Sequence, residues 1–180
     1  DELIITHVSN FRPVKNIKNV IMVFNNIQKE ISSKLLMIGE GPEKEMAEQL
    51  CKDLSIDNKV EFLGNSDQVE KNLCHSDLFL LPSNTESFGL AALEAMASRV
   101  AVISSNAGGL SEINIQGETG YLTDSNDIES MSRYAISILK NPDMLEKFKN
   151  NAFLKAETFD INKVVPLYEM IYNKALNTLK

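Results

Sequence analysis

Two glutamates that flank the start of an expected helix have the types and spacing to do chemistry. Glu86 lies in a polar loop after an apolar run at residues 78–81, and Glu94 follows it within the expected helix. Between them, Phe88, Gly89 and Leu90 should supply backbone N–H groups that have no partner within the helix. Such a helix start attracts anions and hydroxyl oxygens, and carboxylates accept hydrogen bonds from hydroxyls. The pattern predicts a site for a polyhydroxyl ligand, although acids near a helix start also favour the helix dipole without any ligand.

Other reactive patterns in the sequence are incomplete. Ser87 has neither a nearby histidine nor a Gly-x-Ser-x-Gly turn, which argues against a serine hydrolase. The Gly-Glu-Gly-Pro run at residues 39–42 lacks the third glycine of a dinucleotide fingerprint, and we expect it to start a helix with Pro42 in the first turn. His7 and His75 stand apart, and a structural role is favoured for both. Because the chain contains no Asp-x-Asp pair, we expect no metal, and because the dinucleotide fingerprint is incomplete, we expect no cofactor.

The composition is that of an ordinary globular protein of 180 residues. Eighteen Lys and Arg against 25 Asp and Glu give a net charge of −7, which argues against binding to nucleic acid. No apolar run approaches the ~20 residues of a membrane span, and the first residues lack the features of a signal peptide. Cys51 and Cys74 form no Cys-x-x-Cys motif, and we expect reduced, partly buried thiols. Together these features predict a cytoplasmic protein.

Short apolar runs alternate with amphipathic segments along almost the whole chain. The expected strands cover residues 3–8, 34–38, 59–63, 77–81, 100–104 and 121–122. The expected helices cover residues 17–31, 42–54, 66–74, 89–97, 109–114, 126–140 and 142–156. The alternation predicts an α/β fold, a Rossmann-like parallel sheet with helices on both faces. Ligands of such sheets bind beyond the carboxyl ends of the strands, which directs attention to the loops that follow each strand.

The end of the chain has a different pattern. Residues 160–179 form one long expected helix with much apolar surface and no strand after it. This helix either packs on its own domain or reaches toward something outside this chain. We therefore expect a single Rossmann-like domain over residues 1–158 and a separate C-terminal helix over residues 159–180.

The Glu-x7-Glu segment resembles the signature of retaining glycosyltransferases built from two Rossmann-like domains. The matching run at residues 85–97 is Thr-Glu-Ser-Phe-Gly-Leu-Ala-Ala-Leu-Glu-Ala-Met-Ala. Further matches are Gly-Glu-Gly-Pro at 39–42, Phe-Leu-Gly at 62–64, Ser-Asp-Leu at 76–78, Gly-Gly-Leu-Ser-Glu at 108–112 and Gly-Glu-Thr-Gly-Tyr-Leu at 117–122. The resemblance covers nearly the whole chain and implies the C-terminal, nucleotide-sugar-binding half of such an enzyme.

The resemblance also implies roles for individual residues. Glu86 would hold hydroxyls of the donor sugar, helped by backbone amides around Phe88, Gly89 and Leu90. Glu94 would accept hydrogen bonds from the ribose hydroxyls.

Two further regions complete the implied site. Lys15 would neutralise the diphosphate. Many members carry an arginine where this chain has Asn10, and Arg12 is expected to replace that charge. The alternative interpretation of Lys15 and Arg12 is that both are solvated charges in a loop and bind no ligand. The backbone near Gly64 and Asn65 would meet the uracil.

One run of residues indicates a branch of this family, and another run differs from the family's usual sequence. Residues 9–15, Ser-Asn-Phe-Arg-Pro-Val-Lys, are most similar to the branch of the family that transfers N-acetylglucosamine from UDP-GlcNAc to L-malate in bacillithiol biosynthesis. Ser-Arg-Val-Ala at residues 98–101 stands where members often have Cys-Gly-x-Pro, so Arg99 implies either an altered loop or a surface charge.

The implied partners are a UDP-sugar donor and an N-terminal acceptor domain absent from this chain, onto which residues 159–180 would pack. Without that domain, the chain is expected to bind the nucleotide without turning it over. Two alternatives remain open. The acceptor is a polysaccharide or a lipid, or the chain is a non-catalytic flavodoxin-like binding module. Whether the chain forms a homo-oligomer also stays open.

Overall fold

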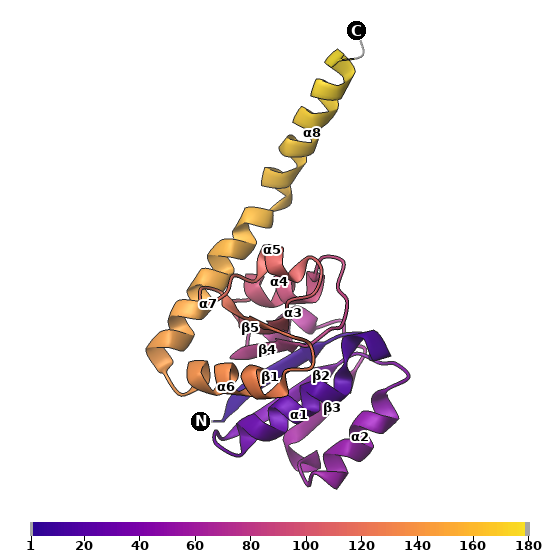
Figure 1. Ribbon diagram of the computed structural model, residues 1–180, viewed down its shortest axis with the longest axis vertical. Helices are drawn as coiled ribbons and strands as arrows, with labels where there is room; N and C mark the ends of the chain where they lie inside the picture. The colour runs from indigo at the N-terminus through magenta and orange to yellow at the C-terminus, as the bar shows by residue number, and fades with distance from the viewer. Residues whose placement is uncertain (1, 179–180) are drawn as a thin grey trace.

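Six parallel strands form one sheet at the centre of the molecule, which the computed structural model describes over residues 2–178 (Figure 1). The strands are β1 Leu3–Val8, β2 Ser33–Ile38, β3 Val60–Gly64, β4 Leu78–Leu81, β5 Ala101–Ser105 and β6 Gly120–Thr123. Their order across the sheet is β3-β2-β1-β4-β5-β6. The chain winds outward from β1 to β3 and then returns to the other side of β1, so the topological switch point lies between β1 and β4. The predicted Rossmann-like fold is confirmed.

Helices cover both faces of this sheet (Figure 1). They are α1 Ile17–Gln28, α2 Lys44–Asp53, α3 Val69–Leu73, α4 Leu90–Ala97, α5 Leu110–Ile113, α6 Ile128–Leu139, α7 Pro142–Ala156 and α8 Ile161–Thr178, with short 3-10 helices η1 Pro13–Lys15, η2 Asp57–Lys59 and η3 Glu157–Phe159. In β4, Leu78 and Leu80 pack in the core under α1, α2 and α6, whereas Phe79 and Leu81 pack in the core under α3, α4 and α5. Burial on both faces explains why this strand is a continuous apolar run.

Several expected helix boundaries are wrong. Helix α1 ends at Gln28, three residues before its expected end at residue 31. Helix α2 begins at Lys44, and Pro42 lies in the turn before it rather than in its first turn. Helix α3 spans only Val69–Leu73, because the polar residues before it form a turn.

Arg99 stands where family members often have a glycine, and the chain still forms a tight turn there. Arg99 adopts a left-handed φ of +60°, which is the conformation that a glycine would favour. Its exposed guanidinium bonds to Glu146 and Asn150 and lies over the ring of Phe153. The surface charge expected at Arg99 is confirmed, and the altered loop stays a prediction.

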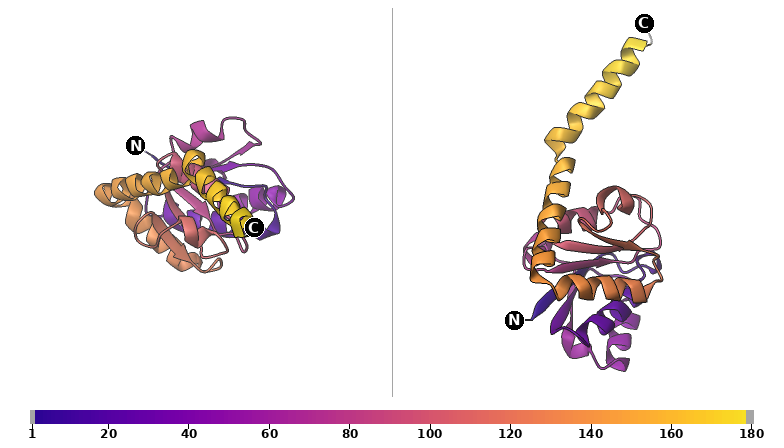
Figure 2. Two further views of the ribbon diagram at one scale, coloured as in Figure 1. Left: turned by 90° about the horizontal axis from the view of Figure 1, so that it is seen from above. Right: turned by 60° about the vertical axis from the view of Figure 1, so that its left-hand side comes forward.

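Helix α8 extends away from the sheet and its covering helices (Figures 1 and 2). Its apolar side chains are largely solvent-exposed, from Ile161 at 71% to Leu176 at 63%. The expectation that this helix packs on its own domain is therefore wrong for the described residues. The last residue of the expected helix, Leu179, lies outside the described part of the chain.

Both cysteines are free thiols, but their surroundings differ. Cys51 is buried, and burial raises its pKa to about 11, whereas Cys74 is exposed rather than partly buried. Over residues 2–178, none of the helices has the length and apolar character to cross a bilayer.

Candidate functional site

Lys15 and Glu86 meet at the carboxyl edge of the sheet, where β1 and β4 are neighbours. The Nζ atom of Lys15 donates to Oε2 of Glu86 at 2.6 Å, although the residues are 71 positions apart in the chain. Their side chains are only 19% and 13% exposed, so water screens the two charges only in part. Two of the three predicted catalytic residues thus lie together at the topological switch point, where open α/β sheets bind ligands.

The main chain of Glu86 is fixed by a glycine pair that follows β5. The N–H of Gly109 donates to the carbonyl oxygen of Glu86 at 3.1 Å. Gly108 has a φ of +53°, and a Cβ atom built there would lie 1.8 Å from that oxygen. Any larger residue at Gly108 would therefore displace the loop from Glu86. The Gly-Gly motif has a physical role, which is to hold Glu86 in position.

Lys15 is presented by the short helix η1. Its N–H donates to the carbonyl oxygen of Arg12 at 2.8 Å, and Asn16 ends the turn in a left-handed conformation with φ +55°. The side chain of Arg12 is exposed and forms no ion pair with another residue of the described range 2–178. Arg12 therefore lies outside the Lys15–Glu86 pair, and its role beside the diphosphate stays a prediction.

The start of helix α4 lies one residue later than expected. Gly89, with φ +97°, caps the helix and accepts from the N–H of Leu93 at 3.0 Å. The unpaired N–H groups of the first turn are consequently those of Gly89, Leu90, Ala91 and Ala92. The ring of Phe88 packs edge-on against Phe159 in η3, with the ring centroids 5.6 Å apart. Phe88 therefore anchors the loop, while Gly89 and Leu90 begin the helix.

A groove of about 290 Å³ lies beyond the ends of β1 and β2 and the loop after β3, and Asn10 and Asn65 line it together. It shares Asp67 and Val69 with a neighbouring groove of about 400 Å³. Glu94, which is exposed, lines this second groove.

The residues expected to meet the nucleoside are thus distributed along one pair of grooves. Gly64 does not line the first groove, but its carbonyl oxygen accepts from the N–H of Gly39, which does, at 2.8 Å. Within the described residues, no hydrogen bond or ion pair joins Glu94 to Glu86, which pairs with Lys15 instead.

A buried histidine connects the loops that carry the ion pair. His7 has no exposed surface; its Nδ1 lies 2.8 Å from the carbonyl oxygen of Leu80 and its Nε2 lies 2.7 Å from Oγ of Ser9. Burial lowers the pKa of His7 to about 4, so the ring is neutral at pH 7. In that state one nitrogen donates to the Leu80 carbonyl and the other accepts from the Ser9 hydroxyl. The structural role expected for His7 agrees with this geometry.

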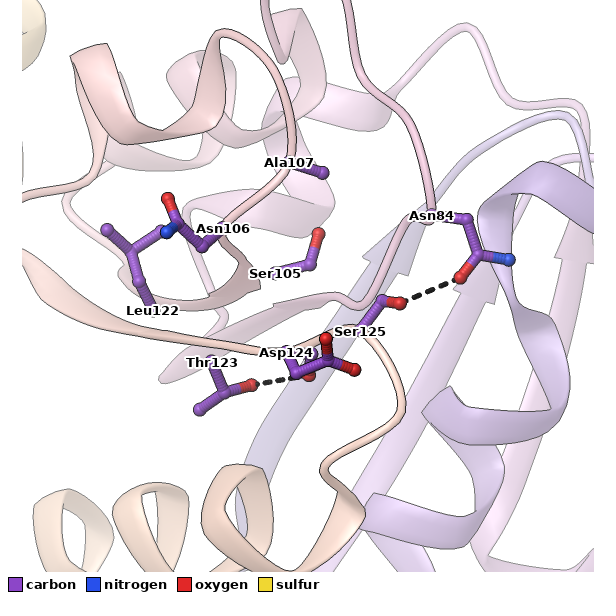
Figure 3. Close-up of a pocket in the computed structure, with 8 residues that line it drawn as sticks. All are labelled: Asn84, Ser105, Asn106, Ala107, Leu122, Thr123, Asp124 and Ser125. Carbon is purple, nitrogen blue, oxygen red and sulfur yellow. Dashed lines mark hydrogen bonds between the residues drawn. The ribbon is translucent and has the colours of Figure 1, made fainter.

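A polar pocket that sequence reasoning missed lies beyond the ends of β4, β5 and β6 (Figure 3). Its volume is about 500 Å³, and it is lined by Asn84, Ser105, Asn106, Ala107, Leu122, Thr123, Asp124 and Ser125. These residues come from the ends of β5 and β6 and from the loops that follow β4, β5 and β6, so no single stretch of sequence contains them as a motif. Over the described range 2–178, no three His, Cys, Asp or Glu side chains gather in a way that suits a metal ion.

Comparison with known proteins assigns the family. A profile of the family described as "Glycosyl transferases group 1" matches residues 1–155. The chain belongs to this family. Group 1 membership agrees with the resemblance inferred from the Glu-x7-Glu segment, and it favours a glycosyltransferase over a flavodoxin-like binding module.

Several relatives of this group 1 chain have descriptive names. It is 41% identical over 179 residues to N-acetyl-alpha-D-glucosaminyl L-malate synthase of Bacillus anthracis, covering 97% of this chain and 46% of that protein. It is 33% identical over 133 residues to 2-deoxystreptamine N-acetyl-D-glucosaminyltransferase of Niallia circulans, covering 70% of this chain and 34% of that protein. The chain therefore spans about half the length of these relatives, or less.

Solved structures share the fold of this group 1 chain. A variant of S. aureus TarM, crystallised with fondaparinux, alpha-GlcNAc-glycerol and UDP, matches with a TM-score of 0.86 and 25% identity over 98% of this chain and 35% of that one. The C-terminal domain of the group 1 glycosyl transferase LpcC from Francisella tularensis matches with a TM-score of 0.80 and 25% identity, covering 90% of this chain and 87% of that domain.

Proposed function

We propose that this chain is the nucleotide-sugar-binding half of a retaining glycosyltransferase that transfers N-acetylglucosamine from UDP-GlcNAc to L-malate. The observation that carries the proposal is the Lys15–Glu86 pair, in which Glu86 lies in the loop that leads into α4. Support for the donor and the acceptor comes from the 41% identity to the L-malate synthase of Bacillus anthracis. Support for a UDP ligand comes from the TarM structure with UDP.

The ion pair suggests how the donor is held. Lys15 and Glu86 neutralise each other at 2.6 Å. A diphosphate brings its own negative charge to Lys15, and this leaves the Glu86 carboxylate available to accept hydrogen bonds from the sugar hydroxyls. Donor binding would therefore exchange one ion pair for a lysine–phosphate contact and carboxylate–hydroxyl contacts.

The leaving diphosphate gains negative charge in the transition state, and a catalyst must stabilise that charge more strongly there than in the ground state. Lys15 and the N–H groups that start α4 supply positive charge and hydrogen-bond donors at this point. Arg12 would add a second cation if its loop turned toward the diphosphate. Since these groups suffice and the sequence has no Asp-x-Asp pair, the proposed donor binding needs no metal.

The nucleoside would lie along the grooves beyond β1, β2 and β3. Asn10 and the backbone at Gly64 and Asn65 would surround the base, and the Glu94 carboxylate would accept hydrogen bonds from the ribose hydroxyls. Support comes from the shared lining of the two grooves, which joins the Asn65 end to the Glu94 end.

The acceptor would be bound by a further domain that contacts α8. The exposed apolar side chains of α8 and the greater length of the relatives support this part of the proposal. The chain alone would then bind UDP-GlcNAc without transferring it to L-malate. The free thiols of Cys51 and Cys74 support a cytoplasmic location, because reduced cysteines are typical of that compartment.

Calorimetry of the chain with UDP, UDP-GlcNAc and UDP-glucose tests the donor. Lys15→Ala should lower UDP affinity about tenfold or more, because a charged hydrogen bond contributes roughly 1.5–3 kcal/mol. Lys18→Ala, which removes an exposed lysine on α1, is the matched control and should change nothing. UDP affinity that is equal in the two variants would overturn the assignment of Lys15. A transfer rate to L-malate that matches a two-domain enzyme would overturn the requirement for a further domain.

A further inference from the structure

Hydrogen bonds among its own lining residues, and one to Val14, fix the walls of the pocket beyond β4, β5 and β6. The N–H of Asn84 donates to the carbonyl oxygen of Val14 at 2.8 Å, and Oδ1 of Asn84 accepts from the hydroxyl of Ser125 at 2.8 Å. The N–H of Asn106 donates to the carbonyl oxygen of Thr123 at 2.8 Å. The three loops are therefore tied to one another, and the pocket is formed before any ligand arrives.

The β6–α6 loop is also tied to α1. The side-chain amides of Asn16 and Asn19 both donate to the carbonyl oxygen of Ser125 at 3.0 Å. Because Asn16 directly follows Lys15, the pocket shares its framework with the loop that carries the ion pair. Asn84 lies two residues before Glu86, so the pocket also adjoins the other member of that pair.

The lining has the chemistry of a site for neutral hydroxyl groups. Asp124 is the one charged residue among the eight that line it, and lysine and arginine are absent from that set. The side-chain amide of Asn106 makes no hydrogen bond within the described range 2–178, and it offers both a donor and an acceptor. Figure 3 shows Asn106 and Leu122 on one side of the pocket and Asn84 with Ser125 on the other, with Ser105 between them.

A buried hydroxyl beside this lining also lacks a partner. Ser83 has no exposed surface, and its Oγ finds no hydrogen-bond partner within residues 2–178. The carbonyl oxygen of Ser83 accepts from the hydroxyl of Ser105, which lines the pocket, at 2.5 Å. Because Ser83 has no exposed surface and does not line the pocket, it supports Ser105 through its carbonyl oxygen and does not itself meet a ligand.

We infer that this pocket binds a neutral, hydroxyl-rich group such as a monosaccharide ring, and that it disfavours anions such as L-malate. A carboxylate in a pocket without cations repels an anionic ligand, whereas Asp124 accepts and Asn106 both donates and accepts hydrogen bonds to hydroxyls. The volume of about 500 Å³ lies in the usual range of small-molecule sites. The bound ring is either the sugar of the UDP-sugar donor or a separate sugar molecule. Only the first of these rests on the proposed function.

The test is a titration of the isotopically labelled chain followed by backbone amide NMR shifts. Free N-acetylglucosamine should shift the amides of Asn106, Thr123 and Asp124 in a saturable way, and L-malate should not. Absence of sugar-induced shifts there, or equal shifts with L-malate, would overturn the inference. Pocket shifts with UDP-GlcNAc that UDP does not produce identify the donor sugar as the source. If only the free sugar shifts these amides, the source is a separate molecule.

Asn106→Leu provides the second test. It removes the amide at nearly constant size from an exposed loop position, and it should lower the affinity for N-acetylglucosamine about tenfold while UDP affinity stays unchanged. Asn58→Leu in η2, at the far edge of the sheet, is the matched control and should leave both affinities unchanged. Equal sugar affinity in the two variants would contradict the inference. If UDP fails to bind the wild-type chain, the proposed function fails, and the free-sugar titration still decides whether the pocket is a sugar site.

Discussion

Replacing Glu86 with glutamine separates the two tasks that the account gives to this residue. Glu86→Gln keeps the size of the side chain and removes the negative charge that pairs with Lys15. At the observed 2.6 Å, the direct Coulomb attraction is about 6 kcal/mol for an effective dielectric constant of 20. Desolvation and lost side-chain freedom offset most of this, and an ion pair near the surface contributes a net stabilisation of about 1 kcal/mol.

The nucleotide alone should therefore bind more tightly to the variant. A diphosphate must displace Glu86 from Lys15 in the wild-type chain, and this cost of about 1 kcal/mol is absent in Glu86→Gln. We expect UDP affinity to rise about fivefold. The sugar should show the opposite effect, because hydrogen bonds to a carboxylate are stronger than those to an amide by about 1.5 kcal/mol, or roughly tenfold. UDP-GlcNAc affinity should consequently fall about twofold.

Calorimetry with UDP and UDP-GlcNAc on the same protein preparation measures both effects. Glu112→Gln, which neutralises an exposed acid on α5, is the control and should alter neither affinity. Thermal unfolding of each variant confirms that the fold is retained. A fall in UDP affinity for Glu86→Gln, or an equal change for the two ligands, would refute the proposed exchange of partners at Lys15.

Three further predictions follow from other parts of the site. Gly108→Ala should destabilise the fold by about 2 kcal/mol or more and weaken UDP-GlcNAc binding, because its Cβ would meet the Glu86 carbonyl oxygen. Gly117→Ala is the control, since Gly117 has a similar φ but open space around it, and it should cost only about 1 kcal/mol. Urea unfolding measures both costs, and equal values would contradict this prediction. Because the pKa of His7 is about 4 in the folded chain, the unfolded chain binds a proton first as the pH falls below ~6.5, and about 3 kcal/mol of stability should be lost between pH 6.5 and 4. The stability of His7→Gln, measured by urea unfolding, should not show this loss between pH 6.5 and 4. The same pH dependence in the variant and the wild-type chain would refute the assignment to His7. A chelator should leave UDP-GlcNAc affinity unchanged, and chelator-sensitive binding would contradict metal-independent donor binding.

The sheet could be predicted from sequence because burial of a strand on both faces requires a short run of apolar residues, which is visible locally. In β4, four consecutive apolar residues are buried on two faces, and this pattern is unambiguous along the chain. The start of α2 was harder to predict from the sequence, because it depends on a contact between loops that are distant in the chain. A Cβ atom on Gly41 would lie 2.1 Å from the carbonyl oxygen of Asn10, so the Gly-Glu-Gly-Pro turn is shaped by the β1 loop rather than by Pro42.

The site was predictable where one segment contains its residues. The Glu-x7-Glu run identified Glu86 and Glu94, but their separate positions depend on how α4 begins after Gly89. The pocket beyond β4, β5 and β6 was missed, because its lining comes from two strand ends and three loops that only the sheet order brings together. Polar residues after each of these strands were the available signal.

A crystal structure of this chain with UDP-GlcNAc would show whether Lys15 exchanges Glu86 for the diphosphate. We expect a diphosphate oxygen within hydrogen-bond distance of the Lys15 Nζ atom, with sugar hydroxyls donating to the Glu86 carboxylate and the nucleoside lying toward Glu94. A nucleotide that binds elsewhere, or a Lys15–Glu86 pair that stays intact beside the bound donor, would refute this exchange.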